Sequence, residues 1–205
     1  MSEIKGNKTK EKEYYDIKYG LATIGNSNVG KHSLITRYTK SQADKITAFS
    51  LGIDIQSKII QIENKKIKIE IIYSPGQERF RSLPKKYFNN QDGIILIYDI
   101  TDKDSFEQII SWIKDIKNHN FEKIKVILVG NKCDLNNERK VSIDKGQNLA
   151  KLYNIKFFEA SAKEGTNVEE LFSYIINEIY HKNNPNKNTL TLKNDSSKSK
   201  KNKCA

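Results

Sequence analysis

The 205-residue chain contains little cysteine, little proline and no long apolar run. Its two cysteines, Cys133 and Cys204, are too few for a disulfide framework, and no Cys/His spacing matches a zinc site, so both are expected to be reduced thiols. No apolar run approaches the ~20 residues that a membrane span needs, and residues 1–14 are too polar for a secretory signal. These absences predict a site of action in the cytosol or on the cytosolic face of a membrane.

The length favours one folded domain with a tail over two domains. Hydrophobic residues make up 37% of the chain and charged residues 30%, and several short Ile/Leu/Val runs require burial, which excludes wholesale disorder. We expect a polar extension over residues 1–14, a folded domain over residues 15–182 and a disordered basic tail over residues 183–205.

Positive charge is concentrated in this tail. Residues 183–205 contain six lysines and one aspartate, and so carry +5 of the net charge of +11. Because no aromatic residue is interleaved with these lysines to stack on bases, nucleic acid is not an expected partner. An anionic membrane surface is the polyanion that such a tail favours.

The apolar pattern predicts an α/β fold of alternating strands and helices. Strands are expected at residues 15–24, 51–62, 67–73, 93–98, 126–129 and 155–159, and helices at residues 32–39, 106–116, 142–153 and 168–180. The second and third strands form an antiparallel hairpin linked by residues 63–66, and the others join through right-handed crossovers. We therefore expect a six-stranded, mostly parallel sheet with one antiparallel hairpin strand and about five helices.

One expected helix carries a clear apolar stripe. The stripe consists of Phe106, Ile109, Ile110, Ile113 and Ile116. Residues at this spacing share one face of a helix, which we expect to pack on the sheet. Trp112 lies beside the stripe and is expected to pack in the core rather than to serve a site.

A glycine-containing loop follows the first expected strand and opens a helix. In the pattern Gly25-x-x-x-x-Gly30-Lys31, glycines let backbone N–H groups close around phosphate, and the lysine would reach the β- and γ-phosphates. The pattern also occurs by chance, and His32 stands where a Ser or Thr would ligate magnesium. The expected phosphate-binding residues are Gly25, Asn26, Ser27, Asn28, Val29, Gly30, Lys31, His32 and Ser33.

Two further motifs follow later strands and point to guanine. The carboxylate of Asp134 can accept hydrogen bonds from the ring N–H and amino group of guanine, a donor pair that adenine lacks. A backbone N–H in the second motif can reach the guanine carbonyl oxygen. Any one motif could be a polar turn, but three in order at the carboxyl ends of strands make coincidence improbable. The expected base-binding residues are Asn131, Lys132, Asp134, Ser161, Ala162 and Lys163.

With these motifs the chain resembles the Ras superfamily of small GTPases, and within it the Rab family, over about residues 15–182. Further Rab-like segments are Leu51-Gly52-Ile53-Asp54, Gly76-Gln77-Glu78-Arg79-Phe80-Arg81-Ser82-Leu83 and Leu96-Ile97-Tyr98-Asp99-Ile100-Thr101. The resemblance implies the P-loop small-GTPase fold. It also implies a switch protein that binds GTP or GDP with Mg²⁺ and acts in intracellular vesicle and membrane traffic.

The resemblance assigns roles to the two switch segments. Ser50, in switch I, matches the residue that senses magnesium and the γ-phosphate, and Gly76 lies in switch II. Gln77 matches the catalytic residue that orients the attacking water. Effector, exchange and GTPase-activating proteins are implied partners through residues 46–55 and 76–90.

Two positions depart from the family's magnesium site: His32 replaces a hydroxyl residue, and Tyr73 replaces an aspartate. Magnesium requires oxygen ligands in near-octahedral geometry, which imidazole and a neutral phenol supply poorly. Ser33 cannot substitute, because one step along a helix rotates the side chain by about 100°. A protonated His32 could instead donate a hydrogen bond to phosphate.

These departures predict a weak magnesium site centred on Ser50 and weakened GTP hydrolysis. Two alternatives stay open at this point. Water could complete the magnesium shell and allow ordinary switching, or the chain could be a pseudo-GTPase scaffold that binds partners without a nucleotide cycle.

Cys204 is the candidate lipid-attachment site. It is second from the end, so it does not form a C-a-a-X box, and the family's usual paired cysteines are absent. An incidental thiol is the plain alternative. However, one lipid beside the basic cluster of Lys198, Lys200, Lys201 and Lys203 is a combination that holds proteins on membranes. We expect prenylation of Cys204 and a lipid-anchored location on the cytoplasmic face of a membrane.

Overall fold

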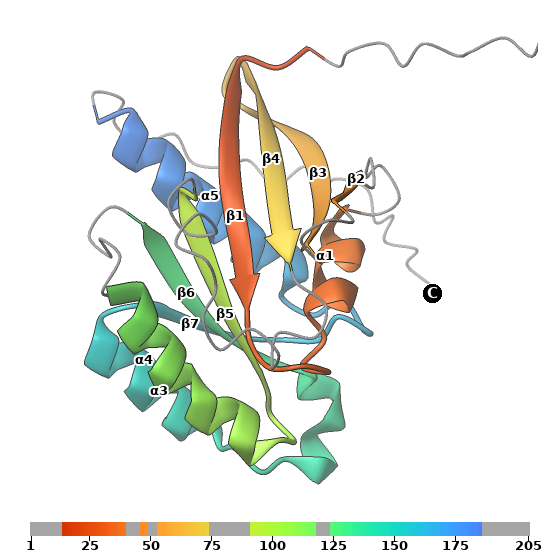
Figure 1. Ribbon diagram of the computed structural model, residues 1–205, viewed down its shortest axis with the longest axis vertical. Coiled ribbons are helices and arrows are strands. Elements are labelled where there is room, and N and C mark those ends of the chain that lie inside the picture. The colour runs from red at the N-terminus through yellow and green to blue at the C-terminus, as the bar shows by residue number, and fades with distance from the viewer. Residues whose placement is uncertain (1–13, 40–45, 49–52, 74–90, 118–123, 186–205) are drawn as a thin grey trace, which may run out of the picture.

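The computed structural model describes residues 14–39, 46–48, 53–73, 91–117 and 124–185 (Figure 1). Within these residues, one sheet has the strand order β2-β3-β4-β1-β5-β6-β7. The strands are β1 (Ile17–Ile24), β2 (Ile46–Ala48), β3 (Ile53–Ile62), β4 (Lys65–Tyr73), β5 (Gly93–Asp99), β6 (Lys125–Asn131) and β7 (Lys156–Ala160). Strand β3 is antiparallel to β2 and β4, and the other neighbouring pairs are parallel.

The expected α/β class and mostly parallel sheet are confirmed. The six expected strands correspond to β1 and β3 to β7, and the short strand β2 extends the edge beside β3. The hairpin link is shorter than expected, since Ile62 pairs with Lys65 and only Glu63 and Asn64 form the turn. Lys65 and Lys66, which were expected in the link, are instead paired in β4. Their polarity resembles that of a loop, but long side chains at a strand end can reach solvent without breaking the pairing.

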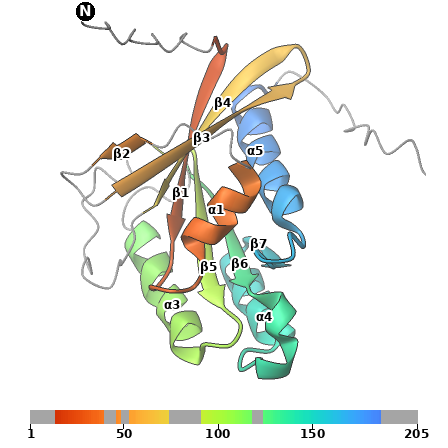
Figure 2. The ribbon, with the colours of Figure 1, turned by 90° about the vertical axis from the view of Figure 1, so that its right-hand side faces the viewer.

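Helices cover both faces of the sheet. The described residues form α1 (Lys31–Thr39), α3 (Lys103–Lys117), the 3₁₀ helix η3 (Cys133–Glu138), α4 (Ile143–Tyr153) and α5 (Val168–Asn183). Helices α1 and α5 lie side by side on one face and α3 and α4 on the other (Figure 2). Strand β5 is central and buried along its whole length, as expected for a parallel strand covered on both faces.

The stripe on α3 is largely confirmed. Ile109, Ile113 and Ile116 are fully buried, and Trp112 packs with them in the core as expected. Ile110 is 39% exposed, so its place in the stripe was wrong. It lies one residue after Ile109, and the 100° rotation per residue turns it away from the sheet.

The last helix ends close to the expected domain boundary. Helix α5 continues to Asn183, one residue into the segment assigned to the tail. The remaining tail from residue 186 and the extension over residues 1–13 lie outside the described residues. Within the described part of the chain, no helix has the length and apolar character required to cross a membrane.

Helix α4 approaches the sheet closely at Gly146. A Cβ built there would lie 2.6 Å from the hydroxyl oxygen of Tyr98 and 2.5 Å from Cζ of Phe157. Tyr98 is fully buried beneath the helix, so it has little room to withdraw. Glycine at this position therefore sets the distance between α4 and the sheet.

We predict that Gly146→Ala lowers the free energy of unfolding by about 1 kcal/mol. Overpacking costs about 1–3 kcal/mol, which outweighs the gain of about 1 kcal/mol in helix propensity. Urea denaturation measures the change, with Asn148→Ala, an exposed position of the same helix, as the control that should gain a few tenths of a kcal/mol. A Gly146→Ala protein more stable than the parent would contradict this packing.

Candidate functional site

The loop between β1 and α1 contains close contacts that glycine permits. Gly30 has φ 91°, and a Cβ at this residue would collide with the side-chain nitrogen of Asn131. A Cβ at Gly25 would collide with the carbonyl oxygen of Ile97. Asn28 also lies in the left-handed region, with φ 62°. Left-handed residues in a loop bring successive N–H groups to one side, as in anion-binding nests.

Lys31 places a positive charge against this loop. Its side chain is almost fully buried, and Nζ donates hydrogen bonds to the carbonyl oxygens of Gly25, at 2.8 Å, and Asn26, at 2.6 Å. Lys31 is also the first residue of α1, so the positive end of the helix dipole lies at the same place. The loop therefore combines an ammonium group with the start of a helix.

Asn131 joins this loop to both of the base motifs. Its side chain is 1% exposed at the end of β6. The amide nitrogen donates to the carbonyl oxygen of Val29 at 2.8 Å, and the amide oxygen accepts from the backbone N–H of Ala162 at 3.3 Å. The structure thus brings together the three motifs that the sequence placed at separate strand ends.

Asp134 is oriented by the neighbouring motif. The Ser161 hydroxyl donates to Oδ1 of Asp134 at 2.6 Å and accepts from the backbone N–H of Glu164 at 3.0 Å. The carboxylate is exposed at the surface, whereas Ser161 is buried beneath it. Lys163, the last residue of that motif, is exposed.

Sequence reasoning did not assign a site role to Asp99. This residue ends β5, is 6% exposed, and its Oδ2 lies 2.6 Å from Nζ of Lys132. Lys132 has the left-handed φ of 66°, so its backbone also departs from the strand at this point. A carboxylate at the end of a buried strand was the signal that could have identified Asp99.

Sequence reasoning also missed the pair of Arg139 and Glu159. The guanidinium donates to both oxygens of the Glu159 carboxylate, at 2.6 and 2.8 Å, and to the carbonyl oxygen of Val141 at 3.1 Å. Hydrogen bonding to Glu159 raises the pKa of Arg139 above its usual value. The pair links the segment after Asp134 to β7, directly before the buried Ser161.

Cys133 lies inside the first base motif. It is a free, half-buried cysteine. Burial raises the pKa of its thiol, and the negative charges of Glu159 and Asp134 raise it further. Because the thiolate is the reactive form, these effects make the thiol less reactive at neutral pH.

The two expected magnesium positions contact each other. Nδ1 of His32 lies 2.7 Å from the hydroxyl oxygen of Tyr73, and Nε2 lies 3.4 Å from the hydroxyl oxygen of Thr36. Tyr73 is 4% exposed, and burial raises the pKa of its phenol, so the group is neutral at pH 7. Neither residue supplies the anionic oxygen that magnesium prefers, so this pair does not fit the ion.

Of the other expected site residues, three fall outside the described part of the chain and one lies on α1. Ser50, Gly76 and Gln77 lie outside the described residues, and Ser33 is exposed on α1. Among the residues that are described, no three His, Cys, Asp or Glu side chains are grouped to hold a metal.

Ser27 carries one of five buried side-chain polar atoms of the described residues that have no hydrogen-bond partner. Its Oγ is buried within the loop between β1 and α1 and has no hydrogen-bond partner among the described residues. Buried polar atoms are usually paired, so an unpaired one marks a place where a ligand can supply the missing partner. Ser27 lies in the loop predicted to bind phosphate.

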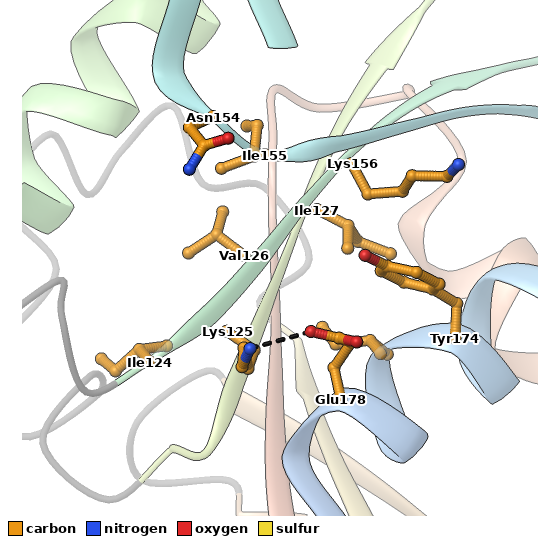
Figure 3. Close-up of a pocket in the computed structure, with 10 residues that line it drawn as sticks. Ile124, Lys125, Val126, Ile127, Asn154, Ile155, Lys156, Tyr174 and Glu178 are labelled. Atoms are coloured by element: carbon orange, nitrogen blue, oxygen red, sulfur yellow. Dashed lines mark hydrogen bonds and ion pairs between the residues drawn. The ribbon is translucent and has the colours of Figure 1, made fainter. Parts of the chain in front are cut away.

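A separate cavity of about 150 Å³ lies at the opposite ends of the strands (Figure 3). It is lined by the beginnings of β6 and β7 and by α5, and an ion pair of 2.8 Å joins Lys125 to Glu178 at its edge. None of the three motifs lines it. This cavity is therefore distinct from the candidate site.

Comparison with known proteins gives a consistent assignment. The model of the Ras family matches residues 20–181. Ras-related protein Rab-8B of Homo sapiens is 41% identical over 170 residues, covering 83% of this chain and 82% of that protein. Ras-related protein Rab-13 of Rattus norvegicus is 39% identical over 197 residues, covering 93% of this chain and 97% of that protein.

A yeast relative agrees with these. GTP-binding protein ypt2 of Schizosaccharomyces pombe is 40% identical over 165 residues, covering 80% of this chain and 82% of that protein. The region that the Ras-family model matches, residues 20–181, includes the loop of residues 25–31 and both base motifs. Together with the fold, these similarities show that the chain belongs to the Ras family, as a small GTPase of the Rab type.

Proposed function

We propose that this protein is a guanine-nucleotide switch that binds GTP and GDP and acts in vesicle and membrane traffic. The observation that carries the proposal is the Asn131 amide, which bonds to both the phosphate loop and the second base motif. The buried hydroxyl of Ser27, which has no hydrogen-bond partner in the described part of the chain, supports a ligand in that loop. The name of one relative, GTP-binding protein ypt2, agrees with this ligand class.

Each end of the nucleotide has a proposed binding surface. The phosphates bind the loop of residues 25–31 and the start of α1 with His32 and Ser33, where Lys31 and the helix dipole supply positive charge. The guanine ring binds between Asp134 and the motif of residues 161–163. The side chain of Lys132, held by Asp99, lines the base site.

The hydrolytic step is proposed to be weak. Gln77 would orient the attacking water, and Ser50 and Gly76 would contact the γ-phosphate region. When bound, magnesium would neutralise phosphate charge, but His32 and Tyr73 are unsuitable ligands for it. A pseudo-GTPase scaffold is the rival, and it is favoured only by these two replacements.

Nucleotide content separates the switch from the scaffold. Protein purified without added nucleotide is denatured, and the released small molecules are identified by mass spectrometry. We expect guanine nucleotide close to equimolar with protein, because the base motifs and the phosphate loop are joined through Asn131. Nucleotide-free protein that also fails to bind added GDP would favour the scaffold.

We predict that Asp134→Asn weakens GDP and GTP binding and improves xanthine nucleotide binding. The change replaces an acceptor with a donor that faces guanine's own donors, at a cost of about 1–3 kcal/mol, or about 5- to 150-fold in affinity. Xanthine presents an acceptor at that edge and should gain affinity. Competition against a fluorescent GDP analogue measures both effects.

The control is Asp144→Asn, which removes the same charge from an exposed position on α4. It should leave both affinities unchanged. If Asp134→Asn binds GDP as well as this control does, Asp134 does not contact the base.

The proposed partners and cellular location are those implied by membership of the Rab family. Effector, exchange and GTPase-activating proteins would bind residues 46–55 and 76–90, of which only 46–48 and 53–55 are described. The tail, with prenylated Cys204 and its lysines, would hold the protein on the cytoplasmic face of a membrane, in exchange with the cytosol. All of the tail from residue 186 lies outside the described residues.

We predict that Cys204→Ser releases the protein from membranes to the cytosol. A single lipid binds only marginally, so the nearby lysines must contribute, at about 1 kcal/mol each on an anionic surface. Replacing Lys198, Lys200, Lys201 and Lys203 with glutamine should therefore also release it. Membrane fractionation and intact-protein mass report binding and lipid attachment.

Cys133→Ser is the matched control, because it removes the other cysteine and leaves the tail intact. It should keep both the lipid mass and the membrane fraction. Continued tight binding of the Cys204→Ser protein would assign anchoring to another part of the chain.

A further inference from the structure

The hydrogen bond between His32 and Tyr73 joins two elements that meet at the phosphate loop. His32 is the second residue of α1, and Tyr73 is the last residue of β4. Strand β4 runs parallel to β1, with Ala22 opposite Ile72, so its end lies beside the strand that enters the loop. The bond therefore crosses the site from the helix to the neighbouring strand.

His32 is the nearest partner of the Tyr73 hydroxyl, which also interacts with the side chains of Gln56 and Asp54. Burial raises the pKa of Tyr73, so its hydroxyl keeps its proton. Either this hydroxyl donates to Nδ1 of His32, or a protonated Nδ1 donates to the phenol oxygen; in both cases, a hydrogen lies between the two atoms. Nε2 of His32 faces the hydroxyl of Thr36 at 3.4 Å.

A magnesium ion held by Nδ1 of His32 or by the phenol oxygen of Tyr73 would break this arrangement. Binding through Nδ1 or the phenol oxygen would remove the hydrogen bond and leave the buried Tyr73 with an altered partner, at the cost typical of an unmade bond. In return, the ion would gain a neutral nitrogen or a neutral oxygen, and both are poor ligands for a hard cation. Asp54 is opposite Tyr73 in the hairpin and adds one carboxylate, but among the described residues it belongs to no group of three His, Cys, Asp or Glu side chains that could hold a metal.

We propose that the His32–Tyr73 hydrogen bond replaces magnesium as the link between α1 and the end of β4, so that guanine nucleotide is retained without a divalent cation. The inference rests on the proposed nucleotide binding. Positive charge at the phosphates then comes from Lys31 and the start of α1. Unlike an ion, the link belongs to the chain and stays when nucleotide leaves.

Nucleotide release tests the inference on the full-length protein. The protein is loaded with a fluorescent GDP analogue, and release is followed after adding excess unlabelled GDP, once with saturating magnesium and once with excess EDTA. We expect the two rates to agree within about twofold. If magnesium binds the nucleotide-bound and nucleotide-free protein equally, removing it does not change nucleotide binding. Release accelerated tenfold or more by EDTA would overturn the inference while leaving nucleotide binding intact.

The double variant His32→Ser with Tyr73→Asp places a hydroxyl and a carboxylate at the two positions. We expect it to gain magnesium dependence, with release at least tenfold faster in EDTA, since both ligands are then oxygens. A folded double variant with no response to EDTA would show that these positions do not control the ion, and would overturn the inference.

A milder variant removes only the hydrogen bond. Tyr73→Phe should speed release about two- to tenfold, the range for one hydrogen bond, equally with magnesium and with EDTA. Tyr180→Phe is the matched control, because its buried hydroxyl donates to Glu63 at 3.0 Å, in the hairpin turn at the other end of β4. This control should lose similar stability and keep the parental release rate.

The outcomes distinguish the two proposals. If Tyr73→Phe releases nucleotide no faster than Tyr180→Phe, the hydrogen bond has no role at the site, and the inference fails although the protein still binds GDP. If the parent protein binds no GDP under either condition, the proposed function fails and the inference fails with it.

Discussion

The side-chain amide of Asn131 constrains the positions of the phosphate loop and of the second base motif. It is buried, so both its nitrogen and its oxygen need partners, and it finds them in Val29 and Ala162. The Val29 bond brings the loop so close that the next residue, Gly30, has no room for a Cβ. A glycine in the first motif is thus explained by an asparagine about a hundred residues later.

Charged pairs then fix the segments on the base side. Lys132 is held by Asp99, and Arg139 is held by both oxygens of Glu159. Both pairs are largely shielded from solvent, where ionic screening is weaker than at the surface. Together with the hydrogen bond from Ser161 to Asp134, they set the position of a carboxylate that is itself exposed.

The fold was predictable from the sequence because its signals are local. Strands β5 and β6 are continuous apolar runs because both faces of each strand are buried. Helix α3 has apolar residues at helical spacing because only one of its faces is buried. The prediction failed at Lys65 and Lys66, whose polar side chains suggested a loop although their backbones pair in β4. It also failed at Ile110, which is apolar but faces away from the sheet, unlike its neighbour Ile109.

The site was predictable only in part. Motif residues at strand ends identified the phosphate loop and the base motifs, whereas Asp99, Arg139 and Glu159 act through partners distant in the sequence. The sequence indicated that His32 and Tyr73 both depart from a magnesium site. Their mutual bond depends on rotamers and on the placement of β4 beside α1, which a linear pattern does not contain.

This bond also makes the effects of substitutions at His32 and Tyr73 interdependent. Serine alone at position 32 is too short to span the distance to Tyr73, so the buried hydroxyl would keep only its interactions with Gln56 and Asp54. Aspartate alone at position 73 would give the imidazole of His32 a carboxylate to bind in place of the phenol. A substitution at one of these positions is therefore expected to have a different effect when the other position is also changed.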